Sequence, residues 1–481
     1  MRVRSAIKIL ALSVGFALVP AGALAASTGG ATAPTGGATA PSGPTGPTGK
    51  TGHTGSTGKT GHSTPGKAVV PTYPTGPPLP KAEVSHLRHV MEGAMKPLGG
   101  HSSAYAIDLA NGEVLFDDDA SIPRNPASVE KLYTLTTALV RFGLDGTLQT
   151  SIYGEGKLEP GGLFVGNLYL RGGGDPTFGD ATFDATNYGT GTTVQALARL
   201  FIAKTHIRKV KGSVIGDESY FDSLRGGPSA NYGIDPNLVG ELSALAFDRG
   251  LTGSEGSPPA YAAFELAGQL RPDGVGVTGR SHAGITPLAS ATKLVTIDSP
   301  PMRTLARLTA VPSDDFFAEM LLKALGARFG SGGTTAAGAA VVRRFLATLD
   351  LAPALVDGSG LSRQDRTTPI DVVTLLRDLS PGGIPALQPV GEALRAAMPV
   401  VSEDGTLEFR MHDSAASGHC IAKTGTLSDA SDLAGWCNGD FAFAFLMNHV
   451  DVLSAEDAQD TMTIALAKLS LPAERATRAR R

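Results

Sequence analysis

Residues 126–134 read PASVEKLYT, and apolar residues continue from there at helical spacing through Leu135, Ala138 and Leu139. This pattern predicts a helix that begins near Ser128. Residues three positions apart lie on one face of a helix, so Ser128 and Lys131 would place a hydroxyl beside an amine. A serine hydroxyl becomes a nucleophile when a base lies within hydrogen-bond reach, and burial or a second cation favours the neutral amine that a lysine base requires. The alternative is that Ser128 is an ordinary helix N-cap.

The Ser-x-x-Lys spacing alone is weak evidence, because it recurs elsewhere in the chain. Two of the other copies lie in segments without the pattern of a folded domain, and the third precedes no long amphipathic helix. These three copies are Ser5/Lys8, Ser56/Lys59 and Ser290/Lys293. Ser128 and Lys131 are therefore the candidate pair.

A second short motif, Lys-Thr-Gly, occurs at Lys50, Lys59 and Lys423, and only Lys423 lies in a strand-like run, residues 421–427. An edge strand there would offer backbone hydrogen bonds to an extended peptide. The ammonium group of Lys423 would hold a carboxylate as a point charge. The alternative is a surface lysine beside a turn.

A third motif stands between the first two, where Ser313-Asp314-Asp315 precedes a predicted helix over residues 316–325. Ser-x-x-Lys, Ser-x-Asn and Lys-Thr-Gly, in this order, form the motif set of penicillin-binding proteins and class A β-lactamases. Over about residues 81–471 the chain resembles the D-alanyl-D-alanine carboxypeptidase/endopeptidase family, the class C low-molecular-mass penicillin-binding proteins. The stretches LYLRGGGDPT (168–177) and DGSGLSR (357–363) match the family as well. The long segment between the first two motifs fits its hallmark insertion and not a compact β-lactamase.

The resemblance implies a catalytic role for four residues. Ser128 would be the acylated nucleophile and Lys131 the base that activates it. Ser313 would relay a proton to the leaving D-alanine amine. Lys423 would bind the substrate carboxylate and lower the proton affinity of Lys131.

The resemblance also implies a substrate-binding strand. Thr424 and Gly425 would line it, and the N–H groups of Ser128 and Thr426 would form the oxyanion hole. No metal or organic cofactor is implied. The implied partners are peptidoglycan stem peptides, with β-lactams as covalent inhibitors.

Asp315 departs from the family pattern, which has Asn at this substrate-binding position. An amide donates and accepts hydrogen bonds, whereas an ionised carboxylate only accepts. An ionised Asp315 would favour the charged form of Lys131 and repel a substrate carboxylate. A protonated Asp315 would imitate Asn. We therefore expect either reduced activity or activity biased toward acidic pH.

The predicted fold class is α/β: a β-lactamase/transpeptidase-like domain, with an antiparallel sheet flanked by helices, and a large β-rich inserted domain. The peptidase domain would be discontinuous, over residues 81–146 and 297–471, with the insertion over 147–296. An Asn-Gly turn signal predicts a hairpin of strands 104–109 and 113–116. Further strands are expected at 168–170, 210–215, 420–424, 434–437 and 441–447. Further helices are expected at 86–95, 336–349, 370–379 and 455–469.

The two ends of the chain differ from this core. Residues 1–25 have the features of a signal peptide: basic residues, an apolar run over 9–20 and the pattern Ala-Leu-Ala before position 26. An uncleaved membrane anchor is the alternative, although the run is shorter than the roughly 20 residues of a membrane span. Residues 26–80 form a low-complexity Gly/Pro/Thr segment with Gly at every third position from 43 to 61, for which a flexible spacer is favoured over a collagen helix. A basic tail occupies 472–481. We expect an extracytoplasmic location: periplasm, cell wall or secreted.

The two cysteines, Cys420 and Cys437, flank a predicted turn over residues 428–431. A disulfide across a hairpin is the favoured interpretation, and two separate buried thiols are the alternative. A zinc site is disfavoured because no His pair accompanies them.

The bulk composition leaves several functional classes open. The 481-residue chain has a net charge of −4, which gives no reason to expect nucleic-acid binding. The leading hypothesis is a serine hydrolase acting on D-alanyl-D-alanine ends or crosslinks of peptidoglycan. The alternatives are a β-lactamase or esterase on the same fold, and a catalytically impaired wall-binding or sensor protein, which Asp315 motivates.

Overall fold

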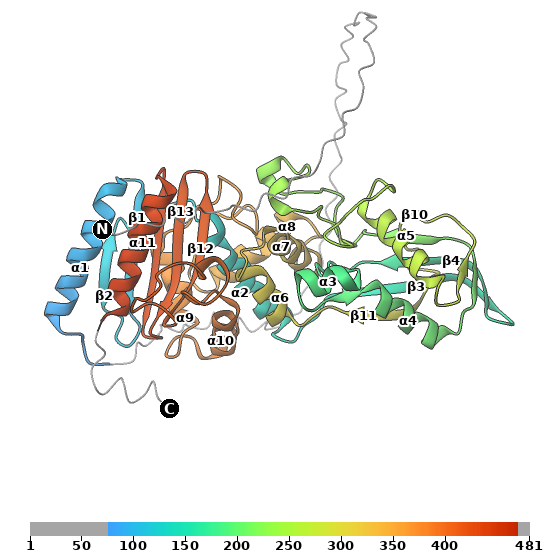
Figure 1. The fold of residues 1–481 in the computed structure, drawn as a ribbon, viewed down its shortest axis with the longest axis horizontal. Helices are drawn as coiled ribbons and strands as arrows, with labels where there is room; N and C mark the ends of the chain where they lie inside the picture. The colour runs from blue at the N-terminus through green and yellow to red at the C-terminus, as the bar shows by residue number, and fades with distance from the viewer. Residues whose placement is uncertain (1–75, 470–481) are drawn as a thin grey trace, which may run out of the picture. The chain divides into compact units, whose positions relative to one another are not determined.

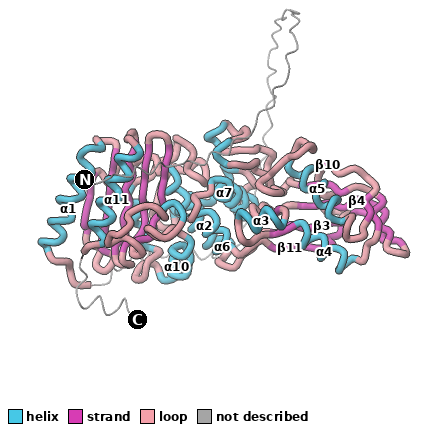
Figure 2. Tube along the Cα trace, in the orientation of Figure 1, coloured by secondary structure: helices cyan, strands magenta, loops and turns pink. Residues whose placement is uncertain are grey.

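The computed structural model describes residues 76–469 and contains two large sheets (Figures 1 and 2). The first is antiparallel throughout, with the strand order β12-β13-β14-β1-β2. Its strands are β1 (Ser102–Asp108), β2 (Val114–Asp118), β12 (Cys420–Leu427), β13 (Ala430–Cys437) and β14 (Phe441–Asn448). The strand that carries Lys-Thr-Gly, β12, therefore lies at one edge of this sheet, as the sequence predicted.

Both faces of the five-stranded sheet are buried. Successive apolar side chains of its central strand, β14, point to opposite faces and pack against different helices. Phe441, Phe443 and Phe445 pack under α1 (Lys81–Met95) and α11 (Val452–Ala467), which lie side by side on one face (Figure 1). Ala442 and Ala444 belong to a second cluster on the opposite face, formed with α2 (Lys131–Phe142) and α9 (Pro369–Asp378). A strand buried on both faces reads as a continuous apolar run, as 441–447 does.

Further helices extend the second cluster: α6 (Met302–Ala310), α7 (Asp315–Phe329), α8 (Thr335–Ala347) and α10 (Gln388–Ala397). The first of these to follow the Ser313 motif, α7, is buried on every side from Phe316 to Gly326. Most of these side chains are apolar, as expected of a helix inside a protein. The buried helix fixes the position of its first residue, Asp315, whose side chain is 18% exposed.

The inserted region forms a mixed seven-stranded sheet on the path β10-β8-β4-β3-β11, with β7 paired to β4 and β9 paired to β7. Its strands are β3 (Gln149–Glu159), β4 (Leu163–Arg171), β7 (Lys209–Lys211), β8 (Val214–Asp217), β9 (Gly276–Val277), β10 (His282–Ala283) and β11 (Thr292–Asp298). A small separate pair is β5 (Phe178–Gly179) and β6 (Thr192–Thr193). One face of the large sheet packs Ile152, Leu168 and Val295 against helices. The β-rich insertion that the sequence predicted is thus present.

Three helices of the inserted region were not predicted: α3 (Ala181–Asn187), α4 (Val194–Thr205) and α5 (Pro258–Leu270). The strand expected over 210–215 is also wrong in detail, since it is split into β7 and β8. Gly212 lies between them so close to β4 that a Cβ atom there would stand 2.0 Å from the carbonyl oxygen of Gly166. This close backbone approach interrupts the strand.

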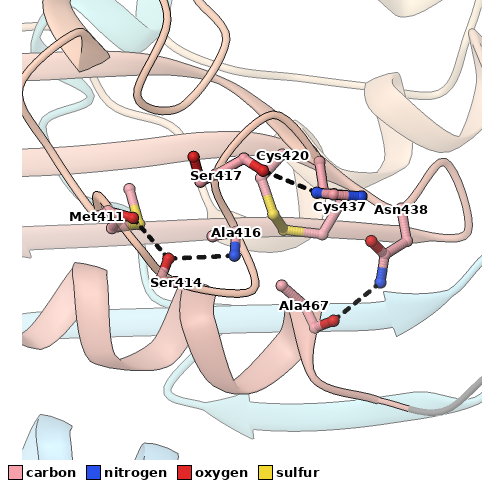
Figure 3. The surroundings of a disulfide bond; sticks show 9 residues. Met411, Ser414, Ala416, Ser417, Cys420, Cys437, Asn438 and Ala467 are labelled. Atoms are coloured by element: carbon pink, nitrogen blue, oxygen red, sulfur yellow. Dashed lines mark hydrogen bonds between the residues drawn. A yellow bond between two sulfur atoms is a disulfide. The ribbon is translucent and has the colours of Figure 1, made fainter.

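Most other elements lie where the sequence placed them, with ends shifted by a few residues. The hairpin β1–β2 and the strands β12, β13 and β14 are confirmed. Cys420 and Cys437 pair directly across β12 and β13 and form the predicted disulfide (Figure 3). The predicted signal peptide, the spacer up to residue 75 and the basic tail lie outside the described residues. Of the last spacer residues, Leu79 is buried and the Gly76 N–H bonds the Ala110 carbonyl at 2.9 Å.

Candidate active site

Ser128 lies in a 3-10 turn, Ala127–Glu130, and α2 begins only at Lys131. The prediction of an α-helix from Ser128 is wrong in this detail, because Ala127 adopts a left-handed backbone (φ 43°). The backbone of Gly360 packs closely against the turn, where a Cβ atom would stand 1.8 Å from the Ala127 carbonyl oxygen. In a 3-10 turn the side chains of residues i and i+3 are eclipsed. The Lys131 Nζ accordingly donates to the Ser128 Oγ at 2.8 Å, and Ser128 caps neither helical segment.

The Lys131 side chain is fully buried and its Nζ has three acceptors. Besides Ser128 Oγ, these are Asp315 Oδ1 and the Ser359 carbonyl oxygen, each at 2.6 Å. Asp315 therefore contacts Lys131 directly, which is the ion pair expected to favour the charged form of the lysine. The Ser359 carbonyl was not predicted, although it lies in the DGSG run that matched the family.

Lys423 projects from β12 into the same cluster and is also fully buried. Its Nζ donates to Ser313 Oγ at 2.7 Å and to the Thr424 carbonyl at 2.9 Å. Burial, and secondarily the charge of Lys131, hold the pKa of Lys423 well below its usual value, while Asp315 opposes this shift. The expected direction was that Lys423 would lower the proton affinity of Lys131. That effect on Lys131 stays a prediction, whereas the charged form of Lys423 is disfavoured by its burial.

The Ser313 motif forms the third wall of the site. Ser313 has a left-handed backbone (φ 61°), and Asp315 is the first residue of α7. Between them, Asp314 caps α7 by accepting the Phe317 N–H at 3.0 Å. The Arg249 guanidinium of the inserted region grips the Asp314 carboxylate at 2.7 and 3.1 Å. This bidentate pair fixes the loop that presents Ser313, and no sequence motif marked Arg249 for that role.

The Arg249 side chain is itself held by its surroundings. It donates to the backbone carbonyls of Leu238 and Val239 at 2.7 and 2.8 Å and lies 4.6 Å from the Phe316 ring centroid. The inserted region is therefore connected to the catalytic motif by one anchored cation.

The remaining predicted substrate residues lie along β12. Thr424 is buried and its Oγ1 bonds Thr406 Oγ1 at 2.8 Å, whereas Thr426 is exposed. Gly425 packs on the nucleophile turn, where a Cβ atom would stand 2.7 Å from the Pro126 carbonyl and 3.1 Å from the Ser128 nitrogen. Only glycine permits this approach, which brings the Ser128 N–H beside the edge strand.

A cleft of about 740 Å³ adjoins this strand. Asp315, Thr426 and Arg363 line it together with Ser229 and Asn237 of the inserted region. Two of the predicted substrate-binding residues, Asp315 and Thr426, thus line a cleft of the size that ligand sites have, and Asp315 connects it to the buried Lys131.

A buried carboxylate supports the loop behind the site. Glu319 Oε1 accepts the N–H groups of Gly358 and Ser359 at 2.8 and 2.9 Å. Burial, with a smaller contribution from Asp357, raises the pKa of Glu319 to about 7. The hydrogen bonds hold the Ser359 carbonyl against Lys131.

A buried Ser-x-x-Lys pair beneath an edge strand, on an antiparallel sheet covered by helices, defines the class of active-serine penicillin-binding folds. The model of the D-Ala-D-Ala carboxypeptidase 3 (S13) family matches residues 88–252 and 236–469. The chain belongs to this family of serine peptidases, and the resemblance predicted from its motifs is confirmed.

Relatives and solved structures agree with the family. The chain is 28% identical over 458 residues to a D-alanyl-D-alanine carboxypeptidase of Actinomadura sp. (strain R39), covering 77% of this chain and 82% of the relative. It is 28% identical over 349 residues to carboxypeptidase DacB of Mycolicibacterium smegmatis, covering 68% and 71%. The fold is similar to penicillin binding protein 4 of Haemophilus influenzae, with a TM-score of 0.63, 19% identity and coverage of 77% of this chain and 98% of that chain.

Two features are absent from residues 76–469, the part of the chain that the structure describes. No group of three or more His, Cys, Asp or Glu side chains is arranged there to hold a metal ion. Within the same range, no helix combines the length and apolar character of a membrane span.

Proposed function

We propose that the chain hydrolyses D-alanyl-D-alanine ends or crosslinks of peptidoglycan through an acyl-enzyme at Ser128. The observation that carries the proposal is the 2.8 Å contact between the Ser128 hydroxyl and the buried Lys131 amine. The neutral amine of Lys131 takes the hydroxyl proton while Oγ bonds to the carbonyl carbon of the penultimate D-alanine. The N–H groups of Ser128 and Thr426 stabilise the resulting oxyanion.

The second half of the acylation step needs a proton for the leaving amine. As the C–N bond breaks, the Ser313 hydroxyl gives its proton to that amine and takes one from Lys423, 2.7 Å away. A substrate carboxylate beside Lys423 favours its charged form, so substrate binding and proton supply are linked. Water then attacks the ester carbonyl and gives its proton to Ser313, which passes one to the neutral Lys423. As the ester C–O bond breaks, the Ser128 oxygen takes back the proton held by Lys131, so the shortened peptide leaves and Ser128 and both lysines are restored.

Asp315 limits this chemistry at neutral pH. Its carboxylate lies 2.6 Å from the Lys131 Nζ and stabilises the ammonium form, which is not a base. Slower acylation than with an uncharged amide at this position is therefore part of the proposal. A wall-binding or sensor protein of low catalytic power is the second candidate, favoured by this contact alone.

The proposed setting is outside the cytoplasmic membrane, after removal of residues 1–25 as a signal peptide. Stem peptides carrying D-alanyl-D-alanine are found there, and a disulfide such as Cys420–Cys437 persists in that environment. Penicillins are the expected covalent inhibitors, through the same serine.

The direct test uses a defined stem pentapeptide and a crosslinked muropeptide dimer, with products identified by mass spectrometry. We expect D-alanine release, dimer cleavage or both, and their loss in Ser128→Ala. Rapid turnover of penicillin without either peptide reaction would favour a β-lactamase. Failure to process any of the three compounds between pH 5 and 8 would favour the binding protein.

A further inference from the structure

A second pocket opens on the inserted sheet, and Ser128 is not among the residues that line it. It has a volume of about 430 Å³, within the range of small-ligand sites. Three cationic and three aromatic side chains line it: Arg171, Lys293, Arg328, Tyr153, Tyr220 and Phe142. None of the residues proposed for catalysis takes part, so the pocket needs an explanation of its own.

The polar face of the inserted sheet builds this pocket. Lys293 on β11 pairs with Tyr153 on β3, and Ser151 on β3 pairs with Arg171 on β4. Side chains two residues apart on a strand share a face, so these residues stand together. Ile152, between Tyr153 and Ser151, points to the other face, into the apolar cluster under α4 and α5.

Arg171 lies in the LYLRGGGDPT stretch (168–177), to which the catalytic site gives no role. Its two following glycines allow close packing, since a Cβ atom at Gly172 would stand 2.0 Å from the Ala244 carbonyl and one at Gly173 2.4 Å from the Gln149 carbonyl. The backbone beside Arg171 is thereby fixed. The stretch builds a rigid support for one guanidinium at the pocket wall.

The positive charges of the pocket exceed the nearby negative ones. Arg171 lies 3.4 Å from the buried Asp217, but its Nε makes no hydrogen bond to any described residue. Asp217 is committed to other donors, because it accepts the N–H groups of Ser219 and Thr286 at 2.8 and 2.9 Å. Asp298 accepts hydrogen bonds from two neutral side chains of the lining, those of Thr147 and Gln149.

The other two cations of the pocket, Lys293 and Arg328, are less compensated by negative charge than Arg171. Among residues 76–469, neither Lys293 nor Arg328 forms an ion pair with a carboxylate. Lys293 Nζ lies 5.6 Å from the Tyr153 ring centroid. The charges of Arg328 and Arg171 act on the Tyr220 hydroxyl, where they oppose the rise in pKa that burial causes. Uncompensated cations around one cavity attract an anion.

The lining selects among anions. Guanidinium groups pair with planar carboxylate or phosphate oxygens, and tyrosine rings pack on the faces of sugar rings while their hydroxyls bond sugar hydroxyls. A ligand that combines these features is a saccharide bearing phosphate or carboxylate groups. We propose that this pocket binds an anionic segment of cell-wall glycan and holds the enzyme on the wall. That the glycan is a wall polymer rests on the proposed function.

The experiment is cosedimentation of the full-length protein with purified insoluble cell wall, after saturation with penicillin so that the catalytic cleft is occupied. The test variant is Lys293→Glu/Arg328→Glu, which reverses two charges. The matched control, Lys209→Glu/Arg280→Glu, reverses two exposed cations of the same region that lie outside the pocket. We expect the apparent Kd to rise about tenfold or more in the test variant and to stay unchanged in the control.

Two wall preparations identify the anion. Hydrofluoric acid removes phosphodiester-linked polymers and leaves the carboxylates of peptidoglycan. Loss of wild-type binding on the treated wall assigns phosphate as the ligand, and retention assigns carboxylate. Both outcomes support the site if the test variant binds weakly to the untreated wall.

Labelled penicillin checks folding separately, since Lys293 and Arg328 have no part in acylation. Should the charge reversal impair acylation, Lys293→Gln/Arg328→Gln replaces it, with Lys209→Gln/Arg280→Gln as its control. The proposal is overturned if an acylation-competent pocket variant sediments like the wild type. Failure of the proposed catalytic function would instead appear as absent acylation in the wild type, with wall binding still measurable.

Discussion

Replacing Asp315 with Asn tests the electrostatics of the proposed base. The substitution removes a negative charge 2.6 Å from the Lys131 Nζ and leaves an oxygen that still accepts its hydrogen bond. At an effective dielectric constant near 20, two unit charges 2.6 Å apart interact by about 6 kcal/mol, which sets a ceiling. The Asp315 side chain is 18% exposed, so solvent lowers this value. If about a fifth of the ceiling, ~1.4 kcal/mol, lies in the acylation barrier, the rate rises about tenfold.

The assay is the second-order rate of acylation by a fluorescent penicillin between pH 5 and 8. We expect Asp315→Asn to react faster than the wild type at pH 7, because the Lys131 amine then faces an uncharged oxygen. Asp145→Asn is the control, because Asp145 pairs only with Arg303 at the surface. Markedly slower acylation by Asp315→Asn at pH 7 would refute the reasoning and make the carboxylate itself part of the base.

Arg249, the disulfide and Asp184 can each be tested by substitution. Arg249→Ala frees Asp314 from its bidentate partner, so the acylation rate should fall about tenfold while binding of a noncovalent substrate analogue changes little; an unchanged rate would show that the loop holds Ser313 without it. Joint replacement of Cys420 and Cys437 with Ala opens a hairpin of 17-residue separation and should cost about 3 kcal/mol by chemical denaturation, whereas no loss would mean that strand pairing alone suffices. Burial raises the pKa of Asp184 to about 8, against an unfolded value near 3.8, so its contribution to stability is complete below pH 4 and is lost as the pH rises to 8. Asp184→Asn should therefore raise the melting temperature at pH 8.5 but not at pH 4. Equal changes in melting temperature at both pH values would contradict the pKa shift.

The convergence of the site was predictable from sequence because each motif carries its own local geometry. Ser128 and Lys131 are three residues apart, and Lys423 lies in an edge strand recognisable from residues 421–427. The order of the three motifs along the chain then identified the family and, with it, the place of Ser313 in the site. No side-chain contact across the cleft had to be known in advance.

The parts that sequence missed depend on tertiary contacts. The Ser359 carbonyl reaches Lys131 only because Glu319 holds its loop, and a backbone oxygen has no residue signature. Arg249 meets Asp314 across 65 residues of chain, through a loop without periodic pattern. The 3-10 turn at Ser128 lies against the backbone of Gly360, a tertiary contact that the propensities of residues 126–134 do not contain.

The helices α4 and α5 were missed for a different reason. Their apolar positions, such as Leu197, Phe201 and Leu266, recur at helical spacing, but glycine-rich neighbours gave the whole insertion a β-like texture. A window confined to each short segment would have found them. Residue composition averaged over a long insertion does not reveal its short helices.

Intact-mass analysis after incubation with penicillin tests the central claim most directly. Peptide mapping should place one covalent adduct, of the mass of the drug, on residue 128, and the Ser128→Ala protein should gain no mass. An adduct on another residue, or equal labelling of that variant, would contradict the account.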